Sequence, residues 1–251
     1  MTTYQDIVNA SFPWAAWALV EASGTDFAPY AGLQHLTATN VNVYQQAGPC
    51  PPSFSIHLNL GKLLSATSLP FLRYFCQEGW YKPDATSGAG TRILMWIGAN
   101  SATEGWGAYL PAANNHLHIL AAPSGPDLDT GFILPTSSFT LVQLANLTGT
   151  TGEITCAVNG EIVGQIVTGG SGSPTGFGFG GESSRASNYV GSLAWPAVYI
   201  QQQTQLSLRS RFVGCSDPVS GLLQTLQGCC TNTDDLLNLI YAAVHKTFPT
   251  T

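Results

Sequence analysis

From about residue 13 to residue 200, short apolar runs alternate with clusters of Gly, Pro, Asn and Ser. This spacing predicts many short strands joined by turns, as in an all-β sandwich or barrel. Asn159 and Gly160 lie between two of these runs, and both tolerate the positive φ angles of a two-residue hairpin turn. The expected strands cover residues 53–60, 71–81, 92–98, 105–110, 117–121, 139–145, 153–159, 161–167 and 189–200.

Helices are expected only near the two ends of the chain. Residues 3–10 predict a short helix with Thr3 as its N-cap. Two more helices are expected after residue 206, over 218–227 and 234–246. The last one carries an apolar stripe at helical spacing, formed by Leu236, Leu237, Ile240, Tyr241 and Val244.

This stripe has to be buried, because an isolated helix of about 13 residues is marginal in water. We expect it to dock onto another copy of the chain or onto a partner. The alternative is that the helices fold back over a sheet of their own chain. The predicted division is a β-domain over residues 1–212 and a helical docking segment over 213–251.

Four segments in order resemble the laminin-G-like modules of bacterial surface proteins and phage structural proteins. They are the opening helix and strand that end in Ser23-Gly24-Thr25, EGWYKP at 78–83, the hairpin at 150–164 and the closing strand at 188–207. The resemblance implies a concanavalin A-like jelly roll, in which two antiparallel sheets pack face to face as a sandwich. Alternation along the strands predicts the following residues between the sheets: Trp80, Ile154, Cys156, Val158 and Val198.

Charged residues make up only 9% of the chain, against roughly 25% in an ordinary soluble domain. The net charge is −6 and there is no basic run, so we expect no nucleic acid partner. No apolar stretch approaches the roughly 20 residues of a membrane span, so we expect no membrane insertion. The N-terminus also lacks the positively charged region of a signal peptide.

These features, with the family resemblance, predict a non-enzymatic virion protein that is assembled in the host cytoplasm. It would be a phage capsid decoration protein or a tail-associated adhesion protein. Its partners would be other virion proteins, copies of itself or glycans of the host surface. One alternative is a secreted or cell-surface lectin domain that binds glycans, which would be extracellular. The other is a polysaccharide-active enzyme with an unrecognised site.

No catalytic residue is predicted. Glycoside hydrolases on this sandwich carry paired carboxylates on one strand, because an acid and a nucleophile must flank one bond. The glutamates of this chain are isolated from one another: Glu78, Glu104, Glu153, Glu161 and Glu182. The glycines at 176–181 fit a dinucleotide-binding pattern, but no helix follows them, so they predict a Gly-rich strand instead.

The candidate binding residues lie between positions 106 and 129. His116 and His118 share one strand face, which Asn114 and Asn115 extend into a polar surface. For stacking on sugar rings we expect Tyr109 and an exposed Trp106. Two carboxylates, Asp127 and Asp129, are candidate ligands of calcium, the only cofactor considered; an acidic solvated loop is the alternative.

The six cysteines show neither CxxC spacing nor histidines at zinc-finger distance. We expect most of them to be reduced, since assembly in the cytosol disfavours disulfides. A disulfide framework is the alternative. Cys156 alternates with apolar residues, which predicts a buried thiol on a strand face.

Overall fold

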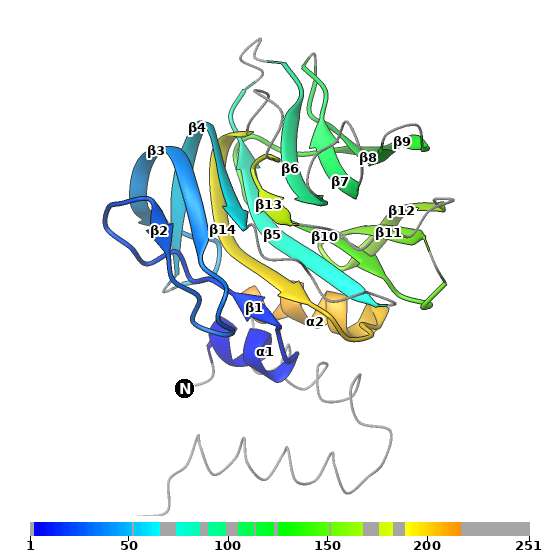
Figure 1. The fold of residues 1–251 in the computed structure, drawn as a ribbon, viewed down its shortest axis with the longest axis horizontal. Coiled ribbons are helices and arrows are strands. Elements are labelled where there is room, and N and C mark those ends of the chain that lie inside the picture. Colours follow the sequence, from blue (N-terminus) through cyan, green and yellow to red (C-terminus); the bar gives the residue numbers. More distant parts are fainter. Residues whose placement is uncertain are drawn as a thin grey trace, which may run out of the picture.

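A computed structural model describes residues 3–51, 53–65, 74–85, 90–98, 105–112, 114–122, 125–150, 152–167, 176–182 and 189–216. Within these residues the chain is all-β and antiparallel, with fourteen strands in one curved sheet and a short helix near each end (Figure 1). The helices are α1 (Tyr4–Ala10) and α2 (Gln205–Ser216). The strands are β1 (Ala15–Ala16), β2 (Asp26–Phe27), β3 (Leu36–Ala47), β4 (Phe54–Ser65), β5 (Phe75–Pro83), β6 (Arg92–Ile97), β7 (Gly105–Leu110), β8 (His116–Ala122), β9 (Asp127–Ile133), β10 (Thr140–Asn146), β11 (Glu153–Val158), β12 (Glu161–Val167), β13 (Phe177–Phe179) and β14 (Tyr189–Tyr199).

The strand order is β12-β11-β10-β5-β14-β4-β13-β6-β7-β8-β9, with β1 beside β14 and β2 and β3 beside β4. The sheet curves until its two end strands meet. A Cβ atom on Gly164 of β12 would lie 3.1 Å from Thr130 and 3.2 Å from Leu128, both on β9. The antiparallel all-β prediction is confirmed. Instead of two separate sheets, however, hydrogen bonding forms one continuous and nearly closed barrel-like sheet.

The hairpin signal is confirmed. β11 and β12 are joined by Asn159 and Gly160, with φ angles of 54° and 80°. The tip is also tied to β10, because the Asn159 N–H donates to the Leu141 carbonyl and the Asn159 side chain accepts from the Leu141 N–H. The N-terminal helix is confirmed as well. Thr3 and Asp6 form a capping box at the start of α1.

Buried apolar side chains form two clusters, one on each face of the sheet. The inner cluster contains these predicted core residues: Ile154, Cys156, Val158 and Val198. The prediction for Trp80 is wrong, because Trp80 is buried in the outer cluster, between the sheet and the helices. Tyr81 faces the inner cluster, so its neighbour Trp80 faces outward, where its indole N–H donates to the Tyr4 hydroxyl at 2.9 Å.

Helix α2 lies across the outer face beside α1 (Figure 1) and covers a buried ion pair. The Arg211 Nε donates to the Glu78 carboxylate at 2.6 Å, and both side chains are fully buried. Gln143 and the Tyr199 hydroxyl also donate to this carboxylate, at 2.8 and 2.9 Å. Burial by itself would lower the pKa of Arg211, but the Glu78 carboxylate together with Tyr199 and Cys76 outweighs burial and raises the pKa above its usual range.

The C-terminal segment is described as far as Ser216. The predicted boundary at residue 212 falls inside α2, which packs on the sheet. The predicted helices over 218–227 and 234–246, with the docking stripe, lie outside the described residues, so docking through them stays a prediction. None of the described helices has the length and apolar character needed to cross a membrane.

Of the four described cysteines, Cys50 and Cys215 form a disulfide across 165 residues of sequence, and the expectation that most of the six are reduced stays a prediction. The bond ties the end of α2 to the loop between β3 and β4. Cys76 and Cys156 are buried free thiols, and Cys229 and Cys230 lie outside the described residues. Burial raises the pKa of Cys156 to about 12, so this thiol stays protonated and unreactive.

Candidate functional site

Five of the predicted binding residues lie together on the outer side of three neighbouring strands. Alternation on β7 and β8 points Ala108, Leu117 and Ile119 into the inner cluster, which leaves the intervening side chains outside. In the register of the strands, Tyr109 lies opposite His118, and His118 lies opposite Asp129. We call this set the His–Asp strip; its members are Tyr109, His116, His118, Asp127 and Asp129.

Hydrogen bonds link the side chains of the strip in two groups, one of Tyr109, His118 and Asp127 and the other of His116 and Asp129. The Tyr109 hydroxyl donates to Asp127 at 2.7 Å, and the same carboxylate lies 3.2 Å from Nδ1 of His118. The other carboxylate, that of Asp129, lies 3.1 Å from Nδ1 of His116 and 3.7 Å from Nε2 of His118. The rings of Tyr109 and His118 are 5.0 Å apart and tilted by 40°.

The strip is open to solvent. The aspartates are 46% exposed, His116 is 34% exposed and His118 is 18% exposed. Hydrogen bonds to the Asp129 carboxylate, first from the Gly131 N–H and second from the His116 side chain, hold the pKa of Asp129 below its usual value. The strip therefore presents carboxylates, imidazoles and a phenol, which together can accept from and donate to the hydroxyls of a ligand.

Asp127 and Asp129 lie on strand β9 and not in an acidic loop. Alternation along Asp127–Ile133 turns both carboxylates outward. Their partners are a phenol, imidazoles and the Gly131 N–H, whereas calcium requires six or more oxygen ligands. Across the described part of the chain, no group of three or more His, Cys, Asp or Glu residues is placed to hold a metal ion.

The expectation of an exposed Trp106 is wrong. On β7, Trp106 shares the parity of Ala108 and Leu110, so its ring points toward the inner cluster and packs 5.3 Å from Phe75. Its indole nitrogen is buried and has no hydrogen-bond partner among the described residues. Tyr109 faces the other side of β7 and is therefore the aromatic member of the strip.

The two asparagines differ in their roles. Asn115 is 9% exposed, and its side chain accepts a 2.7 Å hydrogen bond from Arg92, which is itself buried. Arg92 also donates hydrogen bonds to the backbone carbonyls of Asn114 and Pro111. Burial lowers the pKa of its guanidinium group. Asn115 thus holds the loop before β8, whereas Asn114 is exposed beside the strip and accepts from the His116 N–H.

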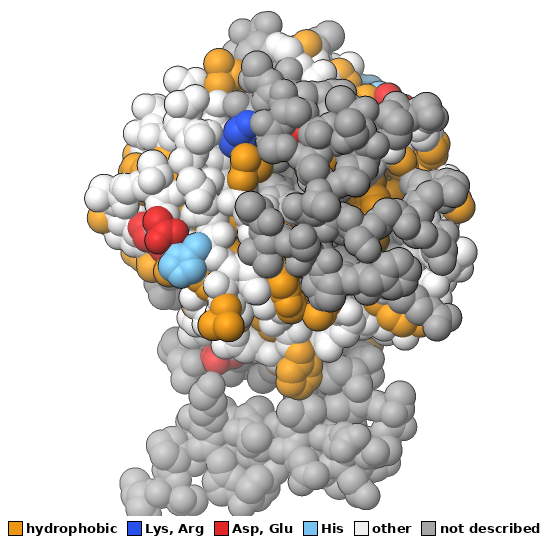
Figure 2. Space-filling view, in the orientation of Figure 1, with side chains coloured by type: hydrophobic (Ala, Val, Ile, Leu, Met, Phe, Trp, Pro, Cys, Tyr) orange, Lys and Arg blue, Asp and Glu red, His pale blue; other side chains and the backbone are white. Residues whose placement is uncertain are grey.

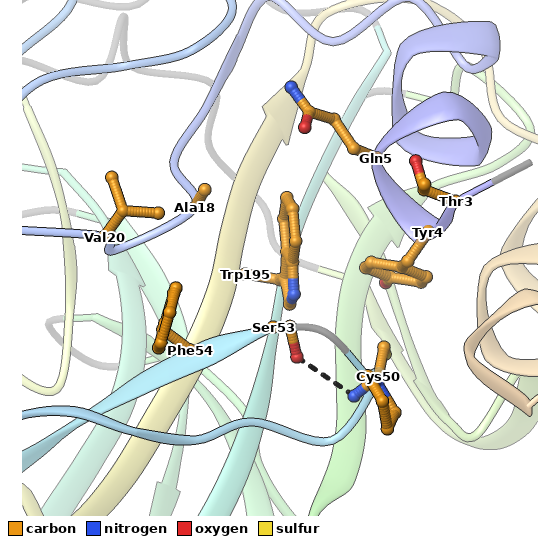
Figure 3. Close-up of a pocket in the computed structure, with 10 residues that line it drawn as sticks. Thr3, Tyr4, Gln5, Ala18, Val20, Cys50, Ser53, Phe54 and Trp195 are labelled. Atoms are coloured by element: carbon orange, nitrogen blue, oxygen red, sulfur yellow. Dashed lines mark hydrogen bonds between the residues drawn. The ribbon is translucent and has the colours of Figure 1, made fainter. Parts of the chain in front are cut away.

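A cleft with a volume of about 160 Å³ lies on the outer face, away from the strip (Figure 3). It opens where α1, the segment after β1 and the loop before β4 meet β14. Trp195 is the aromatic residue at its centre, and sequence reasoning did not select it. The signal was present, since Trp195-Pro196 interrupts a strand pattern, and proline within a strand marks an edge or a bulge.

No family model matches the sequence, and no curated protein matches it. Among solved structures, the chain is similar to a sialidase of Trypanosoma rangeli, with a TM-score of 0.62 and 13% identity over 81% of this chain and 33% of the sialidase. It is also similar to domain 4 of a GH43 extracellular arabinanase from Geobacillus stearothermophilus in complex with arabinotriose, with a TM-score of 0.60 and 13% identity over 79% of this chain and 97% of that domain. A third similar structure is the binding domain of botulinum neurotoxin DC in complex with rat synaptotagmin II, with a TM-score of 0.57 and 13% identity over 82% of this chain and 52% of that one.

The chain spans about a third of the length of the sialidases it resembles, and at these identities the likeness shows the fold alone. These structures correct the functional prediction. They are a sialidase, an arabinanase domain and a toxin binding domain, so the hypothesis of a phage capsid or tail protein is wrong. By its fold, the chain is therefore similar to part of a sialidase, to domain 4 of an arabinanase and to part of a neurotoxin binding domain.

Proposed function

We propose that the chain is a non-catalytic glycan-binding domain of the laminin-G-like type that works outside the cell. The observation that carries the proposal is the His–Asp strip, in which polar side chains from three consecutive strands lie together on one surface open to solvent. Sugar hydroxyls both donate and accept, and the strip offers carboxylate acceptors beside imidazole and phenol groups. The ring of Tyr109 adds a flat apolar face for a sugar ring.

Two further observations support this proposal. The arabinanase domain in complex with arabinotriose is matched over almost its whole length, so the likeness concerns a complete domain of that enzyme. The Cys50–Cys215 disulfide favours an oxidising environment, because such bonds are rare in the cytosol. Among the described residues on the face shown in Figure 2, charged side chains are few and scattered, so contacts with a ligand there would depend on hydrogen bonds and apolar faces.

Binding without hydrolysis is the more specific part of the proposal. Glycoside hydrolysis needs one carboxyl group that donates a proton and another that attacks or activates water, on opposite sides of one bond. In the strip, Asp127 and Asp129 extend from the same face of one strand, and each already has an imidazole partner. Three of the isolated glutamates, Glu78, Glu153 and Glu182, are buried.

The strip is tested by replacing Asp127 or Asp129 with Asn and measuring retardation in gels that contain arabinan, galactan, xylan or β-glucan. We expect the wild-type chain to be retarded by at least one polysaccharide. Each variant should bind that polysaccharide at least about tenfold more weakly, because hydrogen bonds to charged groups contribute about 1.5–3 kcal/mol. Tyr109→Phe should weaken binding less, since it keeps the ring.

The matched control is Asp26→Asn, because Asp26 forms an exposed pair with His35 at 2.8 Å on a different part of the surface. This variant should bind like the wild type. Equal loss in the control, or full binding by both strip variants, would contradict the proposed site. Release of reducing sugar by the wild type that is abolished in Asp127→Asn would instead show an enzyme.

A further inference from the structure

The cleft around Trp195 exists because the backbone of β14 changes its partner there. β14 pairs with β4 up to Leu193 and with β1 from Ala197 onward. Between these points Trp195 and Pro196 form a bulge opposite Gly79 of β5. Trp195 has a φ angle of 48°, an uncommon conformation for a residue with a side chain. Bulges of this kind re-aim side chains and often lie beside functional sites.

The ring of Trp195 is held in place from two sides. Tyr4 and Tyr30 contact it edge-on, with ring centroids 5.3 and 5.6 Å away. Its side chain stands in the cleft between Val20 and Phe54 on one side and Tyr4 on the other (Figure 3). The indole is therefore a fixed wall, so a ligand that packs on it does not have to order it first.

The cleft also contains the buried indole N–H of Trp195, a hydrogen-bond donor for which the described residues provide no acceptor. Trp195 is only 7% exposed, and its indole nitrogen is buried within the described part of the chain. A buried donor without a partner costs about 1–3 kcal/mol, which an acceptor atom of a ligand would recover. The side chains of Thr3, Gln5 and Ser53 add polar groups around the cleft.

The chemistry of the lining restricts the ligand. None of the ten described residues that line the cleft is charged. Its volume of about 160 Å³ is below the roughly 300–1,000 Å³ of pockets for drug-sized ligands, which matches a ligand of about one ring. Val20 and Phe54 are 52% and 39% exposed and form an apolar rim. Such a cleft suits a compact neutral ring that has one apolar face and several acceptor oxygens.

We propose that the Trp195 cleft binds a single neutral sugar ring, the terminal residue of a glycan, through ring packing on Trp195 and a hydrogen bond from its indole N–H. The inference rests on the proposed function for its ligand class, but it does not require the His–Asp strip. The strip would contact the hydroxyls of an extended chain, whereas the cleft receives a chain end.

The test uses calorimetric titration of the full chain with methyl glycosides of arabinofuranose, galactopyranose and glucopyranose, and with anionic N-acetylneuraminate. At least one neutral glycoside should bind with a Kd of about 1 mM, as expected for a ligand of about a dozen heavy atoms. N-acetylneuraminate should bind at least about tenfold more weakly, because none of the described lining residues carries a positive charge that could pair with its carboxylate.

Two variants connect this binding to the cleft. Trp195→Phe keeps an aromatic ring but removes the N–H, and it should weaken neutral glycoside binding about 3–10-fold. Val20→Glu places a charge at the rim and should weaken binding more strongly. Its matched control is Val167→Glu, at a valine that is 63% exposed on β12 and away from the cleft, which should bind like the wild type.

The outcomes separate the two proposals. If no neutral glycoside binds the wild type, or if Val20→Glu binds as well as Val167→Glu, the cleft inference is wrong, whatever the strip variants show. If Asp127→Asn loses polysaccharide binding while glycoside binding persists, both proposals are supported as separate sites. If the cleft variants lose glycoside binding and the strip variants change nothing, the cleft stands and the strip fails.

Discussion

Replacing Arg211 with Met is expected to lower the free energy of unfolding by about 3–5 kcal/mol, because the change leaves the Glu78 carboxylate buried without its cation. Arg211 reaches Glu78 at 2.6 Å, donates to Gln203 at 2.9 Å and lies 4.5 Å from the centroid of the Tyr199 ring. Water cannot take over these hydrogen bonds without a large free-energy cost, since both charged groups are fully buried. Chemical denaturation followed by tryptophan fluorescence measures the loss.

The same helix provides a matched control. Arg209 lies two residues away, is 58% exposed and pairs with the equally exposed Glu161 at 3.5 Å. Arg209→Met should therefore cost only about 0–1 kcal/mol. Combining Arg211→Met with Glu78→Gln should restore part of the lost stability, because the double variant leaves no buried charge unpaired. An Arg211 variant no less stable than the Arg209 variant would show that the ion pair does not hold α2 on the sheet.

Loss of the Cys50–Cys215 disulfide is the second large effect. The bond closes 165 residues of chain, and in the chain-entropy model a loop of this length contributes about 5 kcal/mol, although disulfides removed from natural domains typically cost about 2–5 kcal/mol. Cys215→Ser is the preferred variant, since Cys50 also lines the cleft. Its midpoint of thermal unfolding should lie well below that of the oxidised wild type.

Reductant provides the control for this experiment. The midpoint of the wild-type chain should fall to that of Cys215→Ser when dithiothreitol is added, whereas the variant should not respond. The remaining described cysteines, Cys76 and Cys156, are buried free thiols and should contribute nothing to this difference. A wild-type midpoint that is the same with and without reductant would contradict a stabilising role of the disulfide.

Local chemistry made part of the fold predictable from the sequence. Asn159 and Gly160 specify their turn by backbone conformation alone, and Thr3 caps α1 through an atom three residues away. Strand β3 was not predicted, because most of its side chains are polar or exposed and three register shifts interrupt its pairing with β4. Its alternation is therefore broken, and alternation was the main signal for the strands that were predicted; β1, β2 and β9 were not predicted either.

For the candidate sites, the sequence could supply residues but not their surroundings. His116 and His118 share a face by strand geometry, yet their partners depend on how β9 pairs with β8. Side chains alternate along β7, so Tyr109 faces outward and Trp106 faces the inner cluster. Which of the two faces outward became clear only from the pairing of β7 with β8. Glu78 and Arg211 are 133 residues apart, so no local pattern could have joined them.

The bulge at Trp195 has a consequence for how readily ligand preference can change. The depth of the cleft is set by the backbone of β14, but its rim consists of Gln5, Val20 and Phe54, which come from three separate segments and are exposed. Substitutions at these positions alter the shape and polarity of the opening while the inner cluster stays untouched. Under the proposed assignment, exchanging a few rim side chains would redirect the same scaffold from one sugar to another, which makes these three positions the natural targets for randomisation in a binding library.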